Sequence, residues 1–169
     1  MLLIPIKYIE EGKNELKLVV HPYEIDLTKE FAHDIKINGI IEKFGWQLNI
    51  KAELVTDLNL VCDYTLEEFT ENLKLNINII CKLDNLSQDE KATYAELDNF
   101  IFYKQDDDEI DIGNLVREDL LLNLPMKRVS PKYKNKEFVE IFPEYAAESY
   151  NNLEEKPNPF AVLKNLKIN

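Results

Sequence analysis

The sequence has 169 residues, a length that suits one ordinary domain. Hydrophobic residues make up 45% of it and charged residues 31%, which is the balance of a globular chain with a sizeable core and excludes wholesale disorder or a collagen-like fold. The 20 lysines and arginines face 32 acidic residues. The resulting net charge of −12 argues against general coating of nucleic acid, and we expect no DNA partner.

The two cysteines, Cys62 and Cys81, have no second cysteine or histidine at a metal-binding spacing. This predicts neither a disulfide framework nor a zinc site and favours a reducing compartment. The N-terminal apolar run is broken by Pro5 and Lys7 and is too short for a signal peptide, and no run reaches the roughly 18 apolar residues of a membrane span. We therefore expect a cytoplasmic protein without a membrane partner.

The first third of the chain predicts three strands and a short helix. Strands are expected over Leu2–Ile9, Leu16–Val20 and Ile35–Phe44, the last followed by the turn residue Gly45. Apolar residues among charged ones predict a helix over Glu24–His33.

The clearest periodicity runs from Trp46 to Asp63, where the even positions are apolar except for Thr56 and most odd positions are polar. Such alternation predicts one long strand, or two in series, with one buried face. A second run, from Leu73 to Leu83, alternates on odd positions and predicts the antiparallel partner in a hairpin. A straight strand of this length would span about 50 Å, so we expect a curved sheet.

The acidic run 106–109 predicts a solvated loop, followed by a helix over Ile112–Asn123 with Asp111 as its N-cap and Pro125 as its stop. A cation site in this run is the alternative, although the spacing is not that of a calcium loop. Farther on, Phe138–Glu155 predicts a helix or an ordered arm.

A basic cluster follows Pro125, with five cations and no acid within ten residues, so the remainder of the chain carries −17. The ordinary interpretation is a solvated loop. The functional interpretation is that the lysines and the arginine bind RNA phosphates while a tyrosine stacks on a base. The candidate contact residues are Lys127, Arg128, Lys132, Tyr133, Lys134 and Lys136.

The C-terminal segment predicts a short helix with Asn158 as N-cap and Pro159 at the first helical position. Its apolar stripe is Phe160, Leu163 and Leu166. This stripe either packs on the chain's own sheet edge or docks on a partner with Phe160 as the anchor.

These elements predict one α+β domain over 1–169, with a body at about 1–142 and a C-terminal arm at 143–169. Its curved, mostly antiparallel sheet is built around the long hairpin, with one main helix and a short C-terminal helix. The predicted core is Trp46, Leu48, Ile50, Leu54, Leu58, Leu60, Cys62, Leu73, Leu75, Ile77, Ile79, Leu115, Val116 and Leu120.

Three segments in a fixed order, Leu58–Phe69, Asp108–Pro125 and Pro157–Leu163, resemble the YceD family, the large ribosomal RNA subunit accumulation proteins of bacteria and plastids. The resemblance spans roughly residues 40 to 167. It implies a role in the accumulation of large-subunit (23S) ribosomal RNA and implies no enzymatic activity. The family-motif positions are Cys62, Thr65, Leu124, Pro125, Pro157, Asn158, Pro159 and Phe160.

The chain departs from the family at its cysteines. Many members have a Cys-x-x-Cys where this chain has Cys62 and Thr65, and some have a second pair where it has Ser130 and Tyr133. One presumptive ligand of four remains, so we expect no metal and no cofactor. Cys62 is then either a buried small hydrophobe or a vestige of a ligand position.

Nothing in the sequence favours an enzyme, since His21 and His33 are isolated and only four glycines are present. The first hypothesis is therefore a non-enzymatic factor that binds large-subunit ribosomal RNA or a pre-50S particle through the basic cluster. The alternative is an adaptor that binds a basic ribosomal protein or an assembly factor through its acidic surface.

Overall fold

The computed structural model describes residues 1–85 and 99–143. Contacts within the chain group it into two units, Met1–Arg128 and Val129–Asn169, and each is considered by itself below.

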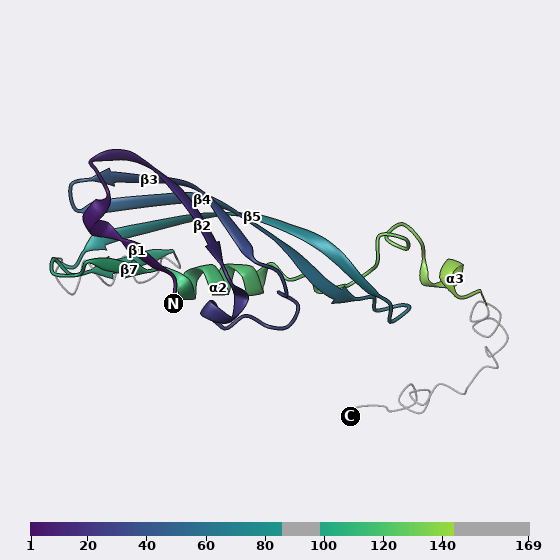
Figure 1. The fold of residues 1–169 in the computed structure, drawn as a ribbon. Helices are drawn as coiled ribbons and strands as arrows, with labels where there is room; N and C mark the ends of the chain where they lie inside the picture. Colours follow the sequence, from purple (N-terminus) through teal and green to yellow (C-terminus); the bar gives the residue numbers. More distant parts are fainter. Residues whose placement is uncertain (86–98, 144–169) are drawn as a thin grey trace, which may run out of the picture. The chain divides into compact units, whose positions relative to one another are not determined.

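The first unit is built on a five-stranded sheet with the strand order β2-β3-β4-β5-β6 (Figure 1). All neighbouring strands in it are antiparallel except β5 and β6. This confirms the predicted α+β class and the mostly antiparallel sheet. The strands are β2 (Gly12–Val20), β3 (Ile35–Phe44), β4 (Gln47–Val61), β5 (Glu68–Leu83) and β6 (Phe100–Tyr103).

The long hairpin of β4 and β5 is confirmed, and β4 is one continuous strand rather than two in series. Every even-numbered side chain from Leu48 to Cys62 is buried, because these residues share the inner face of the sheet. The polar member of this row, Thr56, donates its hydroxyl hydrogen to the carbonyl oxygen of His33 at 3.3 Å, which offsets the cost of its burial.

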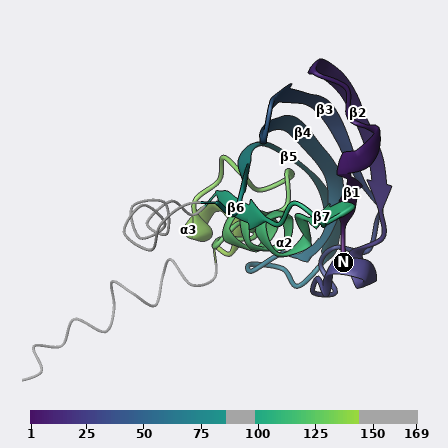
Figure 2. The same ribbon diagram turned by 90° about the vertical axis from the view of Figure 1, so that its left-hand side faces the viewer.

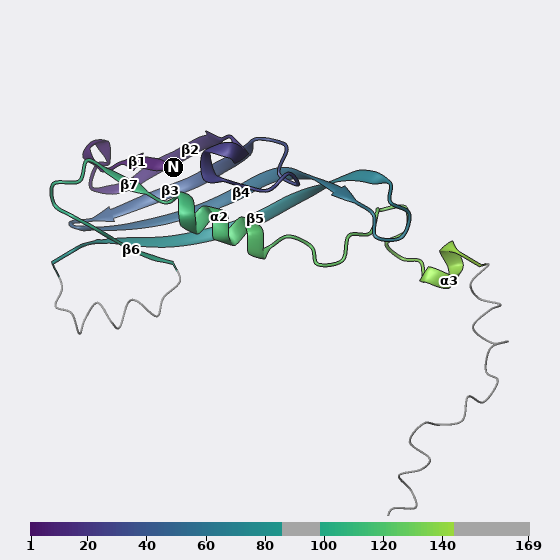
Figure 3. The same ribbon diagram turned by 90° about the horizontal axis from the view of Figure 1, so that it is seen from below.

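A short second sheet and one helix lie on the concave side of the main sheet, as Figure 2 shows. Strand β1 (Leu3–Pro5) pairs antiparallel with β7 (Glu109–Asp111), and a 3-10 helix, Ile6–Tyr8, follows β1. The strand expected over Leu2–Ile9 is therefore shorter than predicted. Helix α2 (Gly113–Leu122) runs beneath the sheet (Figure 3) and buries Val116 and Leu120.

The predicted α-helix over Glu24–His33 is wrong. Only Pro22–Ile25 is helical, as a 3-10 turn that ends at Asp26 in the left-handed region (φ 51°). The apolar residues Ile25 and Phe31 are nevertheless buried. The segment follows the edge of β4 instead of coiling, because its backbone bonds to that strand.

Trp46 was predicted in the core and is 57% exposed, so this prediction is wrong. Phe44 pairs with Gln47, which leaves Gly45 and Trp46 as the two-residue turn between β3 and β4. The even-numbered alternation therefore begins at Leu48, and Trp46 only shares its parity.

Other core positions need smaller corrections. Leu73, Leu75 and Leu115 are partly buried and pack against the core rather than lying within it. The helix begins one residue later than predicted, with Ile112 as its N-cap, although an Asp111 carboxylate oxygen accepts the Gly113 N–H at 2.8 Å.

In the second unit, the described residues end at 143 and contain one short helix, α3 (Phe138–Ile141). The part of the predicted arm beyond residue 143, and with it the terminal helix from Asn158, lies outside the described residues.

Candidate functional site

The loop between β4 and β5 is fixed to the segment that follows α2. The Asp63 N–H donates to the Arg128 carbonyl oxygen at 2.7 Å, and the Arg128 N–H donates to Asp63 Oδ2 at 2.7 Å. These bonds join residues that are 65 positions apart, and they connect the first of the three segments that carry the family resemblance to the residues just after the second.

The Arg128 side chain ties the same place to the segment before β3. Its Nη1 lies 3.1 Å from Glu30 Oε1, a carboxylate whose side chain is 13% exposed. A hydrogen bond from Thr28, together with the Glu30 backbone N–H and the Arg128 guanidinium, lowers the pKa of Glu30. Arg128 is thus a structural clamp, and Glu30 neutralises much of its charge.

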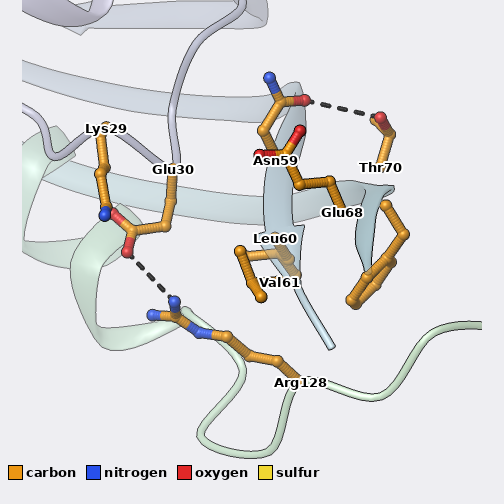
Figure 4. A pocket seen from close by; sticks show the side chains of 9 residues that line it. Lys29, Glu30, Asn59, Leu60, Val61, Glu68, Thr70 and Arg128 are labelled. Carbon is orange, nitrogen blue, oxygen red and sulfur yellow. Dashed lines mark hydrogen bonds and ion pairs between the residues drawn. The ribbon is translucent and has the colours of Figure 1, made fainter. Parts of the chain in front are cut away.

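A groove of about 700 Å³ lies at this clamp, along the edge of β4 that β3 does not reach (Figure 4). At one end the Asn59 N–H donates to the Glu30 carbonyl oxygen at 2.8 Å, and at the other Arg128 binds Asp63. The charged residues that line it are Lys29, Glu30, Glu68 and Arg128. Two cations and two carboxylates leave the lining without net charge, so the groove does not select an anion.

Lys127 is exposed beside this clamp, with its ammonium 4.9 Å from the centroid of the Tyr64 ring. A hydrogen bond with Tyr64 raises the pKa of Lys127. A cation stacked on a tyrosine offers both a phosphate contact and a ring surface for a base.

The other four residues of the basic cluster lie in the second unit. Lys132, Lys134 and Lys136 are exposed, and the Lys136 ammonium lies 5.9 Å from the Tyr133 ring centroid. Successive turns organise this stretch, since the Tyr133 N–H donates to the Ser130 carbonyl oxygen at 2.8 Å. The predicted cluster is therefore divided between two units, with Lys127 and Arg128 in the first.

The family-motif positions lie close to the clamp where the structure describes them. Cys62 is fully buried, and Leu124 and Pro125 are partly buried after the helix. The Thr65 hydroxyl is buried and has no hydrogen-bond partner among the described residues. The tail positions Pro157, Asn158, Pro159 and Phe160 lie outside the described residues.

Cys81, His21 and His33 are further reactive side chains of the described part. Burial raises the pKa of Cys81 to about 12, so it is a thiol at neutral pH. His21 Nδ1 lies 2.5 Å from Asp34 Oδ1, and His33 Nε2 lies 3.3 Å from Asn59 Oδ1, both at exposed positions. Residues 1–85 and 99–143 also contain no cluster of three metal-ligating side chains.

The sequence interpretation missed Glu30, Asp63 and Tyr64 as parts of this site. Glu30 lay in a segment predicted to be helical, and Asp63 ended a run of alternating residues without any mark of a distant partner. A hydrogen bond between residues 63 and 128 leaves no local signal in a single sequence.

Comparison with known proteins finds a family match. No curated protein and no solved structure matches the chain. None of the helices in the described residues has the length and hydropathy to cross a membrane. The model of the family named large ribosomal RNA subunit accumulation protein YceD matches residues 50–167, well over half of the sequence. The chain therefore belongs to the YceD family, which is named for a role in ribosomal RNA accumulation and not for a catalytic activity.

Proposed function

We propose that this protein is a non-enzymatic factor that supports the accumulation of large-subunit ribosomal RNA by binding that RNA, or a pre-50S particle, through the basic cluster. The observation that carries the proposal is the family match over residues 50–167, which includes the whole cluster.

The chemistry of the cluster supports a contact with phosphates. Lys127, Lys132, Lys134 and Lys136 are exposed ammonium groups, and Tyr64 and Tyr133 lie beside two of them. The net charge of −12 does not oppose this, because salt screens charges beyond about 8 Å under physiological conditions. Distant acidic residues then mainly discourage nonspecific coating.

The second candidate is an adaptor for a basic ribosomal protein, favoured by the exposed acidic run at 106–109. Part of this run is used within the chain, since Asp108 pairs with Lys7 at 3.8 Å and Asp107 Oδ2 accepts the Lys104 N–H at 2.7 Å. We therefore rank it second.

A salt titration separates the two candidates. The test compares the segment variant, Lys132→Gln with Lys134→Gln, with a control variant, Lys7→Gln with Lys104→Gln, which loses the same charge elsewhere. Binding to naked large-subunit ribosomal RNA should fall steeply with salt for the wild type and the control variant, and be weaker for the segment variant. An adaptor would not bind naked RNA. Equal binding of RNA by both variants would contradict a contact through the basic cluster.

A further inference from the structure

The convex face of the main sheet is a large surface that no other described element covers (Figure 2). It consists of the odd-numbered residues of β2 and β4 and the even-numbered residues of β3 and β5, where the four strands pair, at 13–19, 36–44, 47–55 and 74–82. We call this the outer face. Most of its side chains are exposed, in contrast to the buried residues that alternate with them.

The outer face differs in charge from the rest of the chain. It contains six lysines and three glutamates, which give it a net charge of +3. Because the whole chain has a net charge of −12, all the other residues together carry −15. An open sheet face needs polar side chains only for solubility, and this requirement does not fix their sign. Positive charge gathered on one face of an acidic protein favours a polyanionic partner there.

Two lysines in one row across the sheet differ from their neighbours in ion pairing. Lys51 and Lys13 each lie 3.5 Å from a Glu42 carboxylate oxygen, and Lys17 pairs with its neighbour Glu15. Lys36 and Lys74, by contrast, have no ion pair with any described residue. Both pair in register with Val55, so they are two strands, or roughly 10 Å, apart.

Side-chain amides lie in the next rows of the outer face. Asn38, Asn76 and Asn78 border a shallow hollow that Lys51 and Glu53 also line. Asparagine is depleted in strands, so this set is unusual for a face that is merely solvated. Each amide both donates and accepts hydrogen bonds, and these groups can bind the edges of unpaired bases.

Aromatic side chains adjoin the same face at the turn between β3 and β4. Phe44 is 58% exposed on the outer face, and Trp46, the chain's one tryptophan, is 57% exposed in the turn itself. Exposed rings on or beside an open sheet are stacking surfaces for unpaired bases.

We propose that the outer face binds single-stranded RNA, with Lys36 and Lys74 contacting phosphates and Asn76 and Asn78 contacting base edges. The inference rests on the proposed function for the kind of nucleic acid. It adds a second surface, whose residues are distinct from those of the basic cluster. A duplex fits this face poorly, because its bases are paired and stacked.

The test measures binding of a fluorescent single-stranded RNA oligonucleotide of mixed sequence by anisotropy across a range of salt concentrations. A sheet variant, Lys36→Gln with Lys74→Gln, is compared with the segment and control variants, each of which loses two positive charges. A fourth variant, Asn76→Ala with Asn78→Ala, changes no charge. The fold of each variant is checked by its thermal unfolding.

Two lost phosphate contacts should lower the slope of log K against log salt by about 1.4 and weaken binding about tenfold at 0.15 M salt. We expect this of the sheet variant and no change for the control variant. The asparagine variant should bind more weakly with an unchanged slope.

If the sheet variant binds like the wild type while the segment variant is weakened, the outer face is not an RNA surface and the proposed function stands. If all three lysine variants are weakened equally, only overall charge matters and the inference fails. If the wild type does not bind RNA, direct RNA contact fails at both surfaces.

Discussion

Arg128 serves the fold in two ways, through its backbone bonds to Asp63 and its side-chain contact with Glu30. Replacing the side chain leaves the backbone bonds in place and removes the partner of a mostly buried carboxylate. The residue was predicted from sequence as an RNA contact, and in the structure its guanidinium is committed to Glu30. The exposed lysines of the cluster are therefore better candidates than Arg128 for the proposed phosphate contacts.

Arg128→Ala should lower the free energy of unfolding by about 1–2 kcal/mol at pH 7. Because the fold lowers the pKa of Glu30 from 4.5, its ionised form stabilises the protein above pH 4.5, and this contribution is lost as the pH falls through the lowered pKa. The deficit of the variant should therefore shrink at pH 3.5. Urea unfolding at pH 7 and at pH 3.5 measures this stability deficit, and Lys127→Ala, at an exposed position, is the control. A deficit that does not change with pH would contradict the role of Glu30.

Unlike the Glu30 carboxylate, which has Arg128 as a partner, the buried Thr65 hydroxyl has no hydrogen-bond partner among the described residues. Valine has nearly the same shape and removes the polar group, so Thr65→Val should raise the free energy of unfolding by about 1 kcal/mol. Thr70→Val, at an exposed position of β5, is the control and should change it little. A destabilised Thr65→Val protein would mean that the hydroxyl does have a partner.

At the scale of elements, the sequence predicted best where one face of a strand decides the pattern. The alternation from Leu48 to Cys62 matches the buried face of β4, because each residue's burial follows from its parity alone. The segment from Glu24 to His33 failed for the converse reason. Its conformation is set by bonds to β4, such as the Asn59 N–H to the Glu30 carbonyl oxygen, and not by its own period.

The close approach of β3 to β4 at Gly39 makes a prediction of the same kind. A Cβ atom at this position would overlap the Lys51 carbonyl oxygen and the backbone of Ala52. Gly39→Ala should therefore lower the free energy of unfolding by about 3 kcal/mol or more, measured by urea unfolding. The neighbouring residue Asn38 lies on the outer face, so Asn38→Ala should lower the free energy of unfolding far less. An equal loss of stability in both variants would contradict the close approach of the two strands.

For the whole molecule, the family could be predicted from three short segments, whereas the arrangement of the site could not. The clamp between residues 63 and 128, the division of the basic cluster between two units and the charge of the outer face all depend on pairings distant in the sequence. A single sequence contains the residues of these surfaces but not their neighbours.

The measurement that tests the central claim most directly is the ratio of large- to small-subunit ribosomal RNA in cells depleted of this protein and supplied with a variant. The variant carries glutamine at Lys127, Lys132, Lys134 and Lys136 and retains Arg128, so that the clamp is intact. With equal protein levels, we predict that wild type restores the ratio and the variant does not. Full restoration of the ratio by the variant would contradict binding of ribosomal RNA through the basic cluster.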